Sequence, residues 1–590
     1  MCGIAGILAR DGSTPSERVL RSFEDALAHR GPDGKGRYLK NGLAMVQTRL
    51  AIIDLVSGDQ PLYGPSGTAL VANGEIYNYL ELRRGFAGAR FVTQSDCEMP
   101  LHVYETRGSE FTRALRGMYA IALYDPGRDA LFLARDPFGI KPLYYAETPD
   151  GLAFASEPQA LLRSGVVKRG IRPETAAELL QLQFTTGRRT IFEDISRVLP
   201  GETLEAHAGR IANRSTVQAL PDGPQRAGSE EGALQLLDKV LMESVVLHQR
   251  ADVPYGMFLS GGVDSSALLA AMARLNERPV RAFTAGFPGT EVRDERAHAA
   301  RVAKAAGAEH IEIAITERDF WEELPAIAAC MDDPAADYAI VPTYLMARTA
   351  ARELKVVLCG EGGDELFAGY GRYRAVRRPR LLGGKPMRRR GLLDGLGLLR
   401  SENARWRDGM AASERAAVGH GWSKLQAAQA TDCADWLPHD LLLKLDRCLM
   451  AHGVEGRTPF LDPMVAEFAF RLPDDLKLRR GVGKFLLRRW LENVLPAADP
   501  FSRKRGFTVP VANWIARRAG DLAPLVARAP GIEELCRRDA VEKLFFQFAR
   551  RMSRREGAAC WQLLFYALWH RVHGEGRIPR GDVFAVLEAK

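Results

Sequence analysis

The residue that follows the initiator methionine is a cysteine, Cys2, and an apolar, glycine-spaced run continues to Ile7. Removal of Met1 would leave a thiol and an α-amine on the same residue. An α-amine has an ordinary pKa of about 8, so it can accept the thiol proton without a separate histidine. The apolar run predicts a buried strand that holds this part of the chain inside the fold. A lone cysteine here is usually incidental, so the residues around it decide its interpretation.

Several polar residues in the first half could hold a small amino-acid substrate near this thiol. Arg49 offers a two-pronged guanidinium for a carboxylate. The side-chain amide of Asn73 and the backbone N–H of Gly74 follow a predicted strand at 69–72 and could form an oxyanion hole. Asp96 could pair with a substrate ammonium group. Each residue taken alone is better explained structurally, Arg49 as a surface charge and Asp96 as a helix cap.

A second chemical feature is the turn Ser260–Ser265, with the sequence Ser-Gly-Gly-Val-Asp-Ser, between an apolar run and a predicted helix. Its glycines permit a tight turn whose backbone N–H groups point at one spot. The helix N-terminus adds about half a unit of positive charge, so a pyrophosphate fits. The kinase-type pattern Gly-x-x-x-x-Gly-Lys-Ser/Thr does not occur at this turn, so γ-phosphoryl transfer is not indicated. The alternative is an ordinary glycine-rich turn.

An acidic glycine turn, Gly360–Glu365, follows another apolar run at 356–359. Its three carboxylates could cap the next helix. They could equally hold Mg²⁺ against phosphates, because this ion takes one or two carboxylates plus phosphate oxygens. If the two apolar runs are neighbouring strands, Asp264 and Asp364 converge at their carboxyl ends, where ligands of open α/β sheets bind. Two acidic turns at the same end of a sheet favour the metal interpretation.

The elements that must position these groups change in kind near residue 206. Before it, the chain is rich in strands and turns, and a helix is predicted to start at the N-cap Thr14, with Pro15 in its first turn and Glu17 closing a capping box. The turn-rich stretch 206–231 is predicted to be a linker. After it, strands alternate with helices, which predicts a parallel sheet with helices on both faces. These strands are predicted at 255–259, 280–287, 309–315 and 356–359.

Composition restricts the class of protein. The chain has 590 residues, 26% of them charged, which is typical of a soluble protein of several domains. Apolar runs fall short of the roughly 20 residues that span a bilayer, and no leader is recognised, so a cytoplasmic location is predicted. Eight scattered cysteines without a Cys-x-x-Cys pair argue against a disulfide framework or a zinc ribbon. The net charge of +8 is densest from Arg372 to Arg390, which is interpreted as a solvated and partly mobile segment.

Together, the motifs of the first half closely resemble those of the class II glutamine amidotransferases, which are N-terminal-nucleophile (Ntn) hydrolases with an α-β-β-α fold. The matching stretches are Cys2-Gly3-Ile4, His29-Arg30-Gly31-Pro32-Asp33, Asn73-Gly74-Glu75-Ile76-Tyr77-Asn78 and Ser95-Asp96. The resemblance implies that Cys2 attacks the side-chain amide of glutamine and releases ammonia through a thioester. It also implies catalytic roles for Asn73 and Gly74 at the oxyanion. The implied glutamine-binding residues are Arg49, Leu50, Ile53, Asn73, Gly74, Glu75 and Asp96.

The second half resembles the PP-loop ATP pyrophosphatases and, within them, the asparagine synthetase family. The matching stretches are Leu259–Ser265, Leu358–Tyr370, Gly453–Asp462 and Gly483-Lys484. The resemblance implies that a carboxylate, aspartate in this family, attacks the α-phosphorus of Mg·ATP, and that ammonia from the first site displaces AMP to give asparagine. It implies catalytic roles for Glu361 and Lys484 and metal binding by Asp264 and Asp364. The implied ATP-binding residues are Leu259, Ser260, Gly261, Gly262, Asp264, Ser265, Ala285, Cys359 and Gly360.

The two resemblances predict a multi-domain α/β protein. Residues 2–205 are expected to form an Ntn-hydrolase α-β-β-α sandwich, and 206–231 a linker. Residues 232–590 are expected to form a doubly wound parallel PP-loop domain with a mostly helical C-terminal part. The implied substrates are glutamine, ATP and an acceptor, with Mg²⁺ as cofactor. The family suggests a homodimer, and neither a nucleic acid nor a membrane is expected as a partner.

The acceptor is the least determined part of this prediction. The segment Asp332–Pro342 matches the acceptor side of the family only loosely and is not rich in threonine and arginine. Gly456 and Thr458 stand where the family usually carries Ala and Val. Aspartate is the preferred acceptor, and another carboxylate on a metabolite, peptide or saccharide is the alternative. A protein that modifies RNA, prompted by a pI of about 9.0, is less favoured because Cys2 has no role in it.

Overall fold

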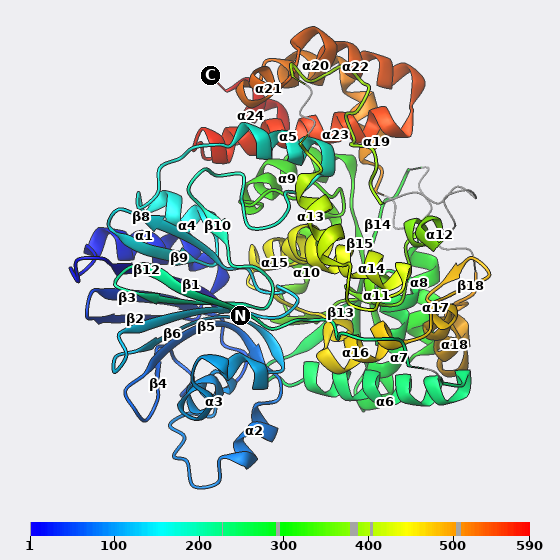
Figure 1. Cartoon of the computed structure of the whole chain (residues 1–590). Coiled ribbons are helices and arrows are strands. Elements are labelled where there is room, and N and C mark those ends of the chain that lie inside the picture. Colours follow the sequence, from blue (N-terminus) through cyan, green and yellow to red (C-terminus); the bar gives the residue numbers. More distant parts are fainter. Residues whose placement is uncertain are drawn as a thin grey trace.

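The computed structural model describes residues 2–226, 228–290, 295–377, 387–401, 405–502 and 509–589. Its N-terminal third contains two six-stranded antiparallel sheets packed face to face (Figure 1). In spatial order, the first sheet contains β10 (Ser196–Arg197), β8 (Tyr144–Thr148), β9 (Gly151–Ala155), β1 (Cys2–Ala9), β3 (Leu43–Arg49) and β2 (Gly34–Lys40). The second contains β12 (Arg210–Thr216), β11 (Glu202–His207), β7 (Ala130–Arg135), β6 (Gly117–Asp125), β5 (Ala69–Ile76) and β4 (Leu62–Tyr63).

Helices cover both outer faces of this pair of sheets. In Figure 1, α1 and α4 lie on one side and α2 and α3 on the other, which confirms the predicted α-β-β-α sandwich. The helical segments of this part are α1 (Glu17–Leu27), η1 (Ala28–Arg30), α2 (Tyr79–Gly85), η2 (Asp96–Glu98), α3 (Met99–Arg107), η3 (Gly108–Ala114), α4 (Pro158–Arg163) and α5 (Pro173–Leu182).

Strand β1 is buried along its whole length, as its apolar sequence predicts. Its side chains alternate between two cores, because successive residues of a strand point to opposite faces. Ile4 and Leu8 pack in the core between the two sheets, whereas Ala5 and Ile7 pack in the core that contains the apolar face of α1. The two cores therefore hold β1 on both of its faces, and Cys2 lies at the start of this strand.

The predicted start of the first helix is wrong. Helix α1 begins at Glu17 with Ser16 as its N-cap residue, and no side-chain hydrogen bond caps it. The predicted capping box from Thr14 does not form, because the Glu17 carboxylate binds Arg21 at 2.7 Å and Arg37 at 2.9 Å instead.

The predicted linker 206–231 begins too early. Residues up to Thr216 belong to the hairpin of β11 and β12, which extends the second sheet. Strand β12 lies at the edge of the sheet and is mostly exposed, so its sequence is as polar as that of a linker. The irregular segment between the two halves follows β12, and helix α6 starts at Glu230.

The second half is built on a five-stranded parallel sheet, as predicted. Its spatial order is β15 (Glu309–Ala314), β14 (Arg281–Gly286), β13 (Tyr255–Phe258), β16 (Val356–Leu358) and β17 (Glu455–Arg457). Met257 and Ala282 pack into one core with the helices of one face, and Phe258 and Phe283 into another core with those of the other face. The sheet is therefore doubly wound. Strand β17 was not predicted, because it is only three residues long and lies far along the chain.

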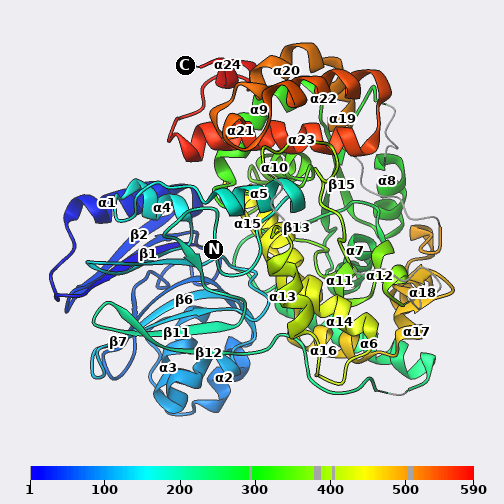
Figure 2. The same ribbon diagram turned by 45° about the horizontal axis from the view of Figure 1, so that its top comes forward.

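The remaining elements of the second half are mostly helical. Before the C-terminal group they are α6 (Glu230–His248), α7 (Val263–Leu275), α8 (Arg296–Ala305), α9 (Glu317–Cys330), α10 (Ile340–Ala350), α11 (Gly363–Leu366), α12 (Gly371–Arg377), α13 (Asp408–Ala416), α14 (Lys424–Thr431), the π-helix η5 (Asp432–Leu441), α15 (Leu442–Met450), η6 (Pro459–Leu461), α16 (Pro463–Arg471), α17 (Asp474–Lys477), the hairpin β18 (Leu478–Arg479) and β19 (Val482–Gly483), α18 (Phe485–Val494) and η7 (Pro496–Ala498). The C-terminal group is α19 (Val511–Arg517), α20 (Ala519–Ala527), α21 (Pro530–Leu535), α22 (Arg538–Arg551), α23 (Arg554–Trp569), η8 (His570–Gly574) and α24 (Val583–Glu588). Figures 1 and 2 show this group as a helical cap at the top of both views, where α23 contacts α5, and α23 and α24 contact α9.

Three further predictions concern composition. None of the eight cysteines, all of which are in the described part, forms a disulfide. No described helix has the length and apolar character needed to cross a membrane. In the basic segment, Arg378, Arg380 and Lys385 lie outside the described residues. Arg372 is not simply solvated, since it binds the buried Asp432 at 2.8 Å.

Candidate active sites

The first site is organised around Cys2, at the junction of the two halves of the molecule. Cys2 lies opposite Arg49 in the pairing of β1 with β3, and only 6% of it is exposed. Its backbone N–H donates to Oδ1 of Asn73 at 3.1 Å, and the N–H of Leu50 donates to its sulfur. Burial raises the pKa of the Cys2 thiol above its ordinary value. A nearby base is therefore needed before this thiol can act as a nucleophile.

Asn73 and Gly74 lie inside β5 rather than after it, so the strand predicted at 69–72 was too short. Asn73 is fully buried, and its amide nitrogen has no hydrogen-bond partner among the described residues. A buried donor of this kind is costly unless a ligand satisfies it. Gly74 has a φ of 155°, and a Cβ at this position would lie 2.0 Å from the carbonyl oxygen of Met118. Only glycine fits there.

Arg49 is not a surface charge. Its side chain is buried, and its guanidinium donates to Asp59 at 2.7 Å and to the carbonyl of Ile53 at 3.4 Å. The loop after β3 therefore fixes the orientation of this cation beside Cys2. Arg49, Leu50 and Ile53 are brought together as predicted.

Glu75 and Asp96 form an acidic end of the same site. The carboxylate of Asp96 accepts a hydrogen bond from the N–H of Ile76 at 2.6 Å. Burial, with the nearby charge of Asp96, raises the pKa of Glu75 well above its ordinary value. Arg457, from strand β17 of the other half, lies 3.5 Å from Glu75 and supplies a compensating charge. Sequence reasoning missed Arg457, although it lies within a matching stretch.

The second site lies at the carboxyl end of the parallel sheet. Strands β13 and β16 are neighbours, so the two acidic glycine turns meet as predicted. A Cβ on Gly363 would lie 2.6 Å from the carboxyl carbon of Asp264, which shows how closely the turns approach. Lys484 joins them, because its ammonium binds Asp264 and lies 2.6 Å from Asp364. Burial acts to lower the pKa of Lys484, but the two carboxylates outweigh it and the pKa is raised.

Two adjoining cavities of about 270 and 440 Å³ open beside these turns. Volumes of this order suit a nucleotide and a small second substrate. The smaller cavity is lined by the predicted ATP-binding residues Leu259, Ser260, Gly262, Asp264, Ser265, Ala285, Cys359 and Gly360, together with Glu361 and Asp364. Gly261 and Lys484 line the larger one. The structure thus brings every predicted residue of this site to one place.

Asp264 and Asp364 have the donor chemistry for Mg²⁺. Both carboxylates reach the same cation, the ammonium of Lys484, so they converge on one point. The described residues contain no cluster of three or more side chains that could cage a metal. Two carboxylates completed by phosphate oxygens are the usual way in which proteins hold Mg²⁺.

Comparison with known proteins shows the family of the chain. The family model described as asparagine synthase matches residues 236–571, which is more than half of the chain, and the one described as glutamine amidotransferase domain matches residues 1–216. The chain belongs to the asparagine synthase family. A protein of Mycobacterium bovis is 35% identical over 98% of both chains. Asparagine synthetase [glutamine-hydrolyzing] 1 of Bacillus subtilis is 30% identical over 98% of both chains. Amidase chyE of Penicillium rubens is 34% identical over 64% of this chain and 60% of its own.

In this member of the asparagine synthase family, Lys444 is a further cation of the second site. It was not predicted from the sequence. It lines the smaller cavity with Glu361 and binds Asp337 at 3.1 Å. Burial acts to lower the pKa of Lys444, but Asp337 and Glu361 outweigh it and raise the pKa. The available signal was a single lysine inside the apolar run Leu441–Leu445.

The acceptor-side segment Asp332–Pro342 is only partly at the cavity. Asp337 and Tyr338 line it, whereas Asp332 and Asp333 bind Arg447 and Arg197 elsewhere.

Proposed function

We propose that this chain is a glutamine-hydrolysing asparagine synthetase that transfers ammonia from glutamine to aspartate at the expense of ATP. One observation carries the proposal: two carboxylates from neighbouring glycine turns converge on Lys484. In the same chain, the backbone N–H of the buried Cys2 donates to the amide oxygen of Asn73, whose amide nitrogen has no partner among the described residues. The similarity to the named synthetase of Bacillus subtilis along both chains supports it.

In the proposed first half-reaction, Met1 is removed and the α-amine of Cys2 accepts the thiol proton. The thiolate then attacks the side-chain amide carbon of glutamine, while Asn73 and Gly74 donate to the developing oxyanion. The protonated amine gives its proton to the leaving ammonia, and water hydrolyses the thioester to glutamate. Arg49 faces the α-carboxylate of glutamine, and Asp96 its ammonium group.

In the second half-reaction, the β-carboxylate of aspartate attacks the α-phosphorus of ATP and pyrophosphate leaves. The N–H groups of Ser260–Ser265 bind the pyrophosphate, and Lys484 neutralises its charge. Asp264 and Asp364 would hold Mg²⁺, which would supply further neutralisation of the phosphates. Ammonia then attacks the acyl carbon, AMP leaves, and Glu361 accepts the released proton. Desolvation raises the pKa of Glu361, which suits a group that must take up a proton near neutral pH.

Separate sites make chemical sense because free ammonia near pH 7 is mostly ammonium, which is not a nucleophile. Release into the protein interior keeps ammonia neutral and protects the acyl-adenylate from water.

The test is to incubate the protein with glutamine, ATP, Mg²⁺ and aspartate and to measure asparagine, glutamate and AMP together. All three products should appear in equal amounts. Formation of AMP with another acceptor but none with aspartate would contradict the proposed substrate. Absence of AMP with every acceptor would contradict the reaction class.

A larger carboxylate is the second candidate acceptor. The 440 Å³ cavity continues beyond Lys484 to Tyr338 and Trp436, which is more room than an aspartate side chain needs. The similarity to an amidase over about two thirds of this chain also favours a wider choice of substrate. The same assay, with metabolite, peptide and saccharide carboxylates in place of aspartate, distinguishes the two candidates.

A further inference from the structure

Helix α15 is buried completely, although it carries three charged residues. All nine residues of Leu442–Met450 are buried, including Lys444, Asp446 and Arg447. A buried charge is costly unless it is paired. The partners of these three side chains therefore indicate what the helix connects.

Lys444 points to the second site. It lines the smaller cavity, where it faces Glu361 and binds Asp337 at 3.1 Å. A substrate that carries a carboxylate or phosphate into this cavity offers Lys444 a new partner. The position of this side chain is therefore sensitive to what the cavity contains.

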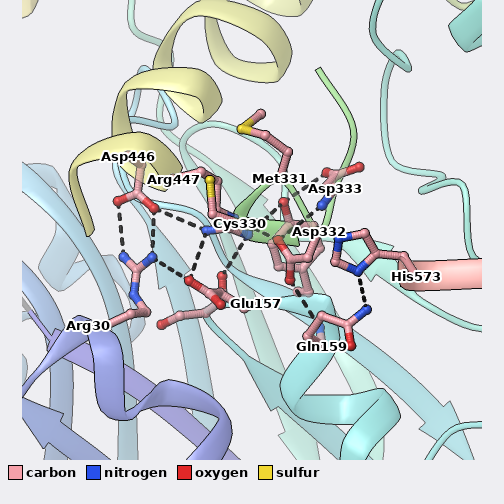
Figure 3. Close-up of polar contacts among 12 residues, drawn as sticks. Arg30, Glu157, Gln159, Cys330, Met331, Asp332, Asp333, Asp446, Arg447 and His573 are labelled. Atoms are coloured by element: carbon pink, nitrogen blue, oxygen red, sulfur yellow. Dashed lines mark hydrogen bonds and ion pairs between the residues drawn. The ribbon is translucent and has the colours of Figure 1, made fainter. Parts of the chain in front are cut away.

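Asp446 points to the first site. Its two oxygens bind the guanidinium of Arg30 at 2.8 and 3.0 Å (Figure 3). Nε of the same Arg30 donates to the backbone carbonyl of Cys2 at 3.2 Å. Residues two apart on an α-helix project about 200° from each other. One side of α15 therefore faces the synthetase cavity, and its other side binds Arg30, which contacts Cys2.

A dense set of ion pairs fixes this connection. Arg30 also binds Glu157 at 2.8 Å, and Arg447 binds Asp446 at 3.0 Å and Asp332 at 2.7 Å (Figure 3). The charges come from both halves of the chain, and each is buried. A network of this kind has few arrangements that satisfy every member. A shift of α15 must therefore be accompanied by a shift of Arg30.

We propose that α15 couples the two sites, and that Asp446 is the positioning residue that acts on Cys2 through Arg30. The proposal rests on the proposed function. With the synthetase cavity empty, Lys444 stays on Asp337 and glutamine is cleaved slowly. When the adenylate fills the cavity, Lys444 changes partner, α15 shifts, and the Arg30–Cys2 contact takes the geometry that favours cleavage. Ammonia is then released only when an acceptor is ready.

The test compares glutaminase kcat/KM with and without saturating ATP, Mg²⁺ and aspartate. Coupling between sites is typically worth a factor of about 5 to 150, and we expect a stimulation of that order in the wild-type protein. In Asp446→Asn it should fall to about one, because a shift of α15 no longer reaches Arg30. AMP formation with added ammonium should not change, because Asp446 does not touch the cavity.

Asp333→Asn is the matched control. Asp333 is also buried and binds Arg197 across the two halves, at 2.7 Å, but its carboxylate binds Arg197 and Tyr144 and not Arg30 or Asp446. This variant should keep the stimulation. A stimulated Asp446→Asn protein, or an equal loss of stimulation in Asp333→Asn, would overturn the proposal.

A measurement on the wild-type protein covers the case in which Asp446→Asn does not fold. Hydrogen exchange of peptides from α15 and η1 should change when ATP, Mg²⁺ and aspartate are added without glutamine. No change in either peptide would also refute the coupling. The asparagine assay decides the proposed function separately, since a protein can make asparagine with no stimulation of its glutaminase.

Discussion

Asn73→Ala gives the sharpest test of the first site. In the free protein, Oδ1 of Asn73 accepts from the Cys2 N–H at 3.1 Å, while its amide nitrogen has no partner among the described residues. In the proposed reaction this nitrogen donates to the oxyanion. Loss of one such donor costs a factor of about 10² to 10³ in kcat, or about 3–4 kcal/mol. The N–H of Gly74 remains, so the reaction should be slowed and not abolished.

The same geometry predicts a small effect on stability. Removal of Oδ1 leaves the Cys2 N–H unsatisfied, at a cost of about 1–3 kcal/mol. Removal of the unsatisfied amide nitrogen relieves a cost of about the same size. The two contributions oppose each other, so the thermal midpoint should move by no more than about 2 °C.

The assay measures glutamate release from glutamine and AMP release with added ammonium. Asn73→Ala should lose only the glutamine-dependent rate. Gln60→Ala is the control, because Gln60 is also a buried amide that accepts a hydrogen bond from β5, at the N–H of Ala72. An equal loss of both rates in Asn73→Ala, or the same glutamine-specific loss in Gln60→Ala, would refute the oxyanion role.

The other predictions concern the nucleophile, the second site and pH. Cys2→Ala should abolish glutamine-driven turnover and keep ammonium-driven AMP formation; glutamate release by this variant would show that another residue is the nucleophile. Asp264→Asn should abolish AMP formation from both nitrogen sources, and an active variant would exclude Asp264 from the phosphate site. Burial and the charge of Asp364 raise the pKa of Glu365 from 4.5 to about 7. Between these two pH values the folded state keeps a proton that the unfolded state has released. The free energy of unfolding therefore falls as pH rises through this window. Glu365→Gln should therefore gain up to about 3 kcal/mol over wild type between pH 5 and 7, measured from thermal midpoints; parallel pH profiles would contradict this shift.

The features that the sequence predicted well are those that depend on local patterns and on simple topology. The approach of Asp264 to Asp364 follows from two glycine turns at the ends of adjacent parallel strands. The linker was misplaced because the edge strand β12 has a polar, exposed sequence. Contacts between distant segments left no local pattern: Arg30 and Asp446 are 416 positions apart.

Helix α15 shows most clearly why local reasoning fails at a domain junction. In Leu-Leu-Leu-Lys-Leu-Asp-Arg, an amphipathic pattern would place the charged residues toward solvent. The structure buries them, because Asp337, Arg30 and Asp332 from other segments supply opposite charges. Stability alone does not require this arrangement, since buried ion pairs can often be replaced by apolar residues at little cost. A helix that served only to fill the junction could thus carry leucine at these positions, with apolar residues in place of the three partners as well. Charges whose partners reach two separate active sites are better explained by the need to position groups in both.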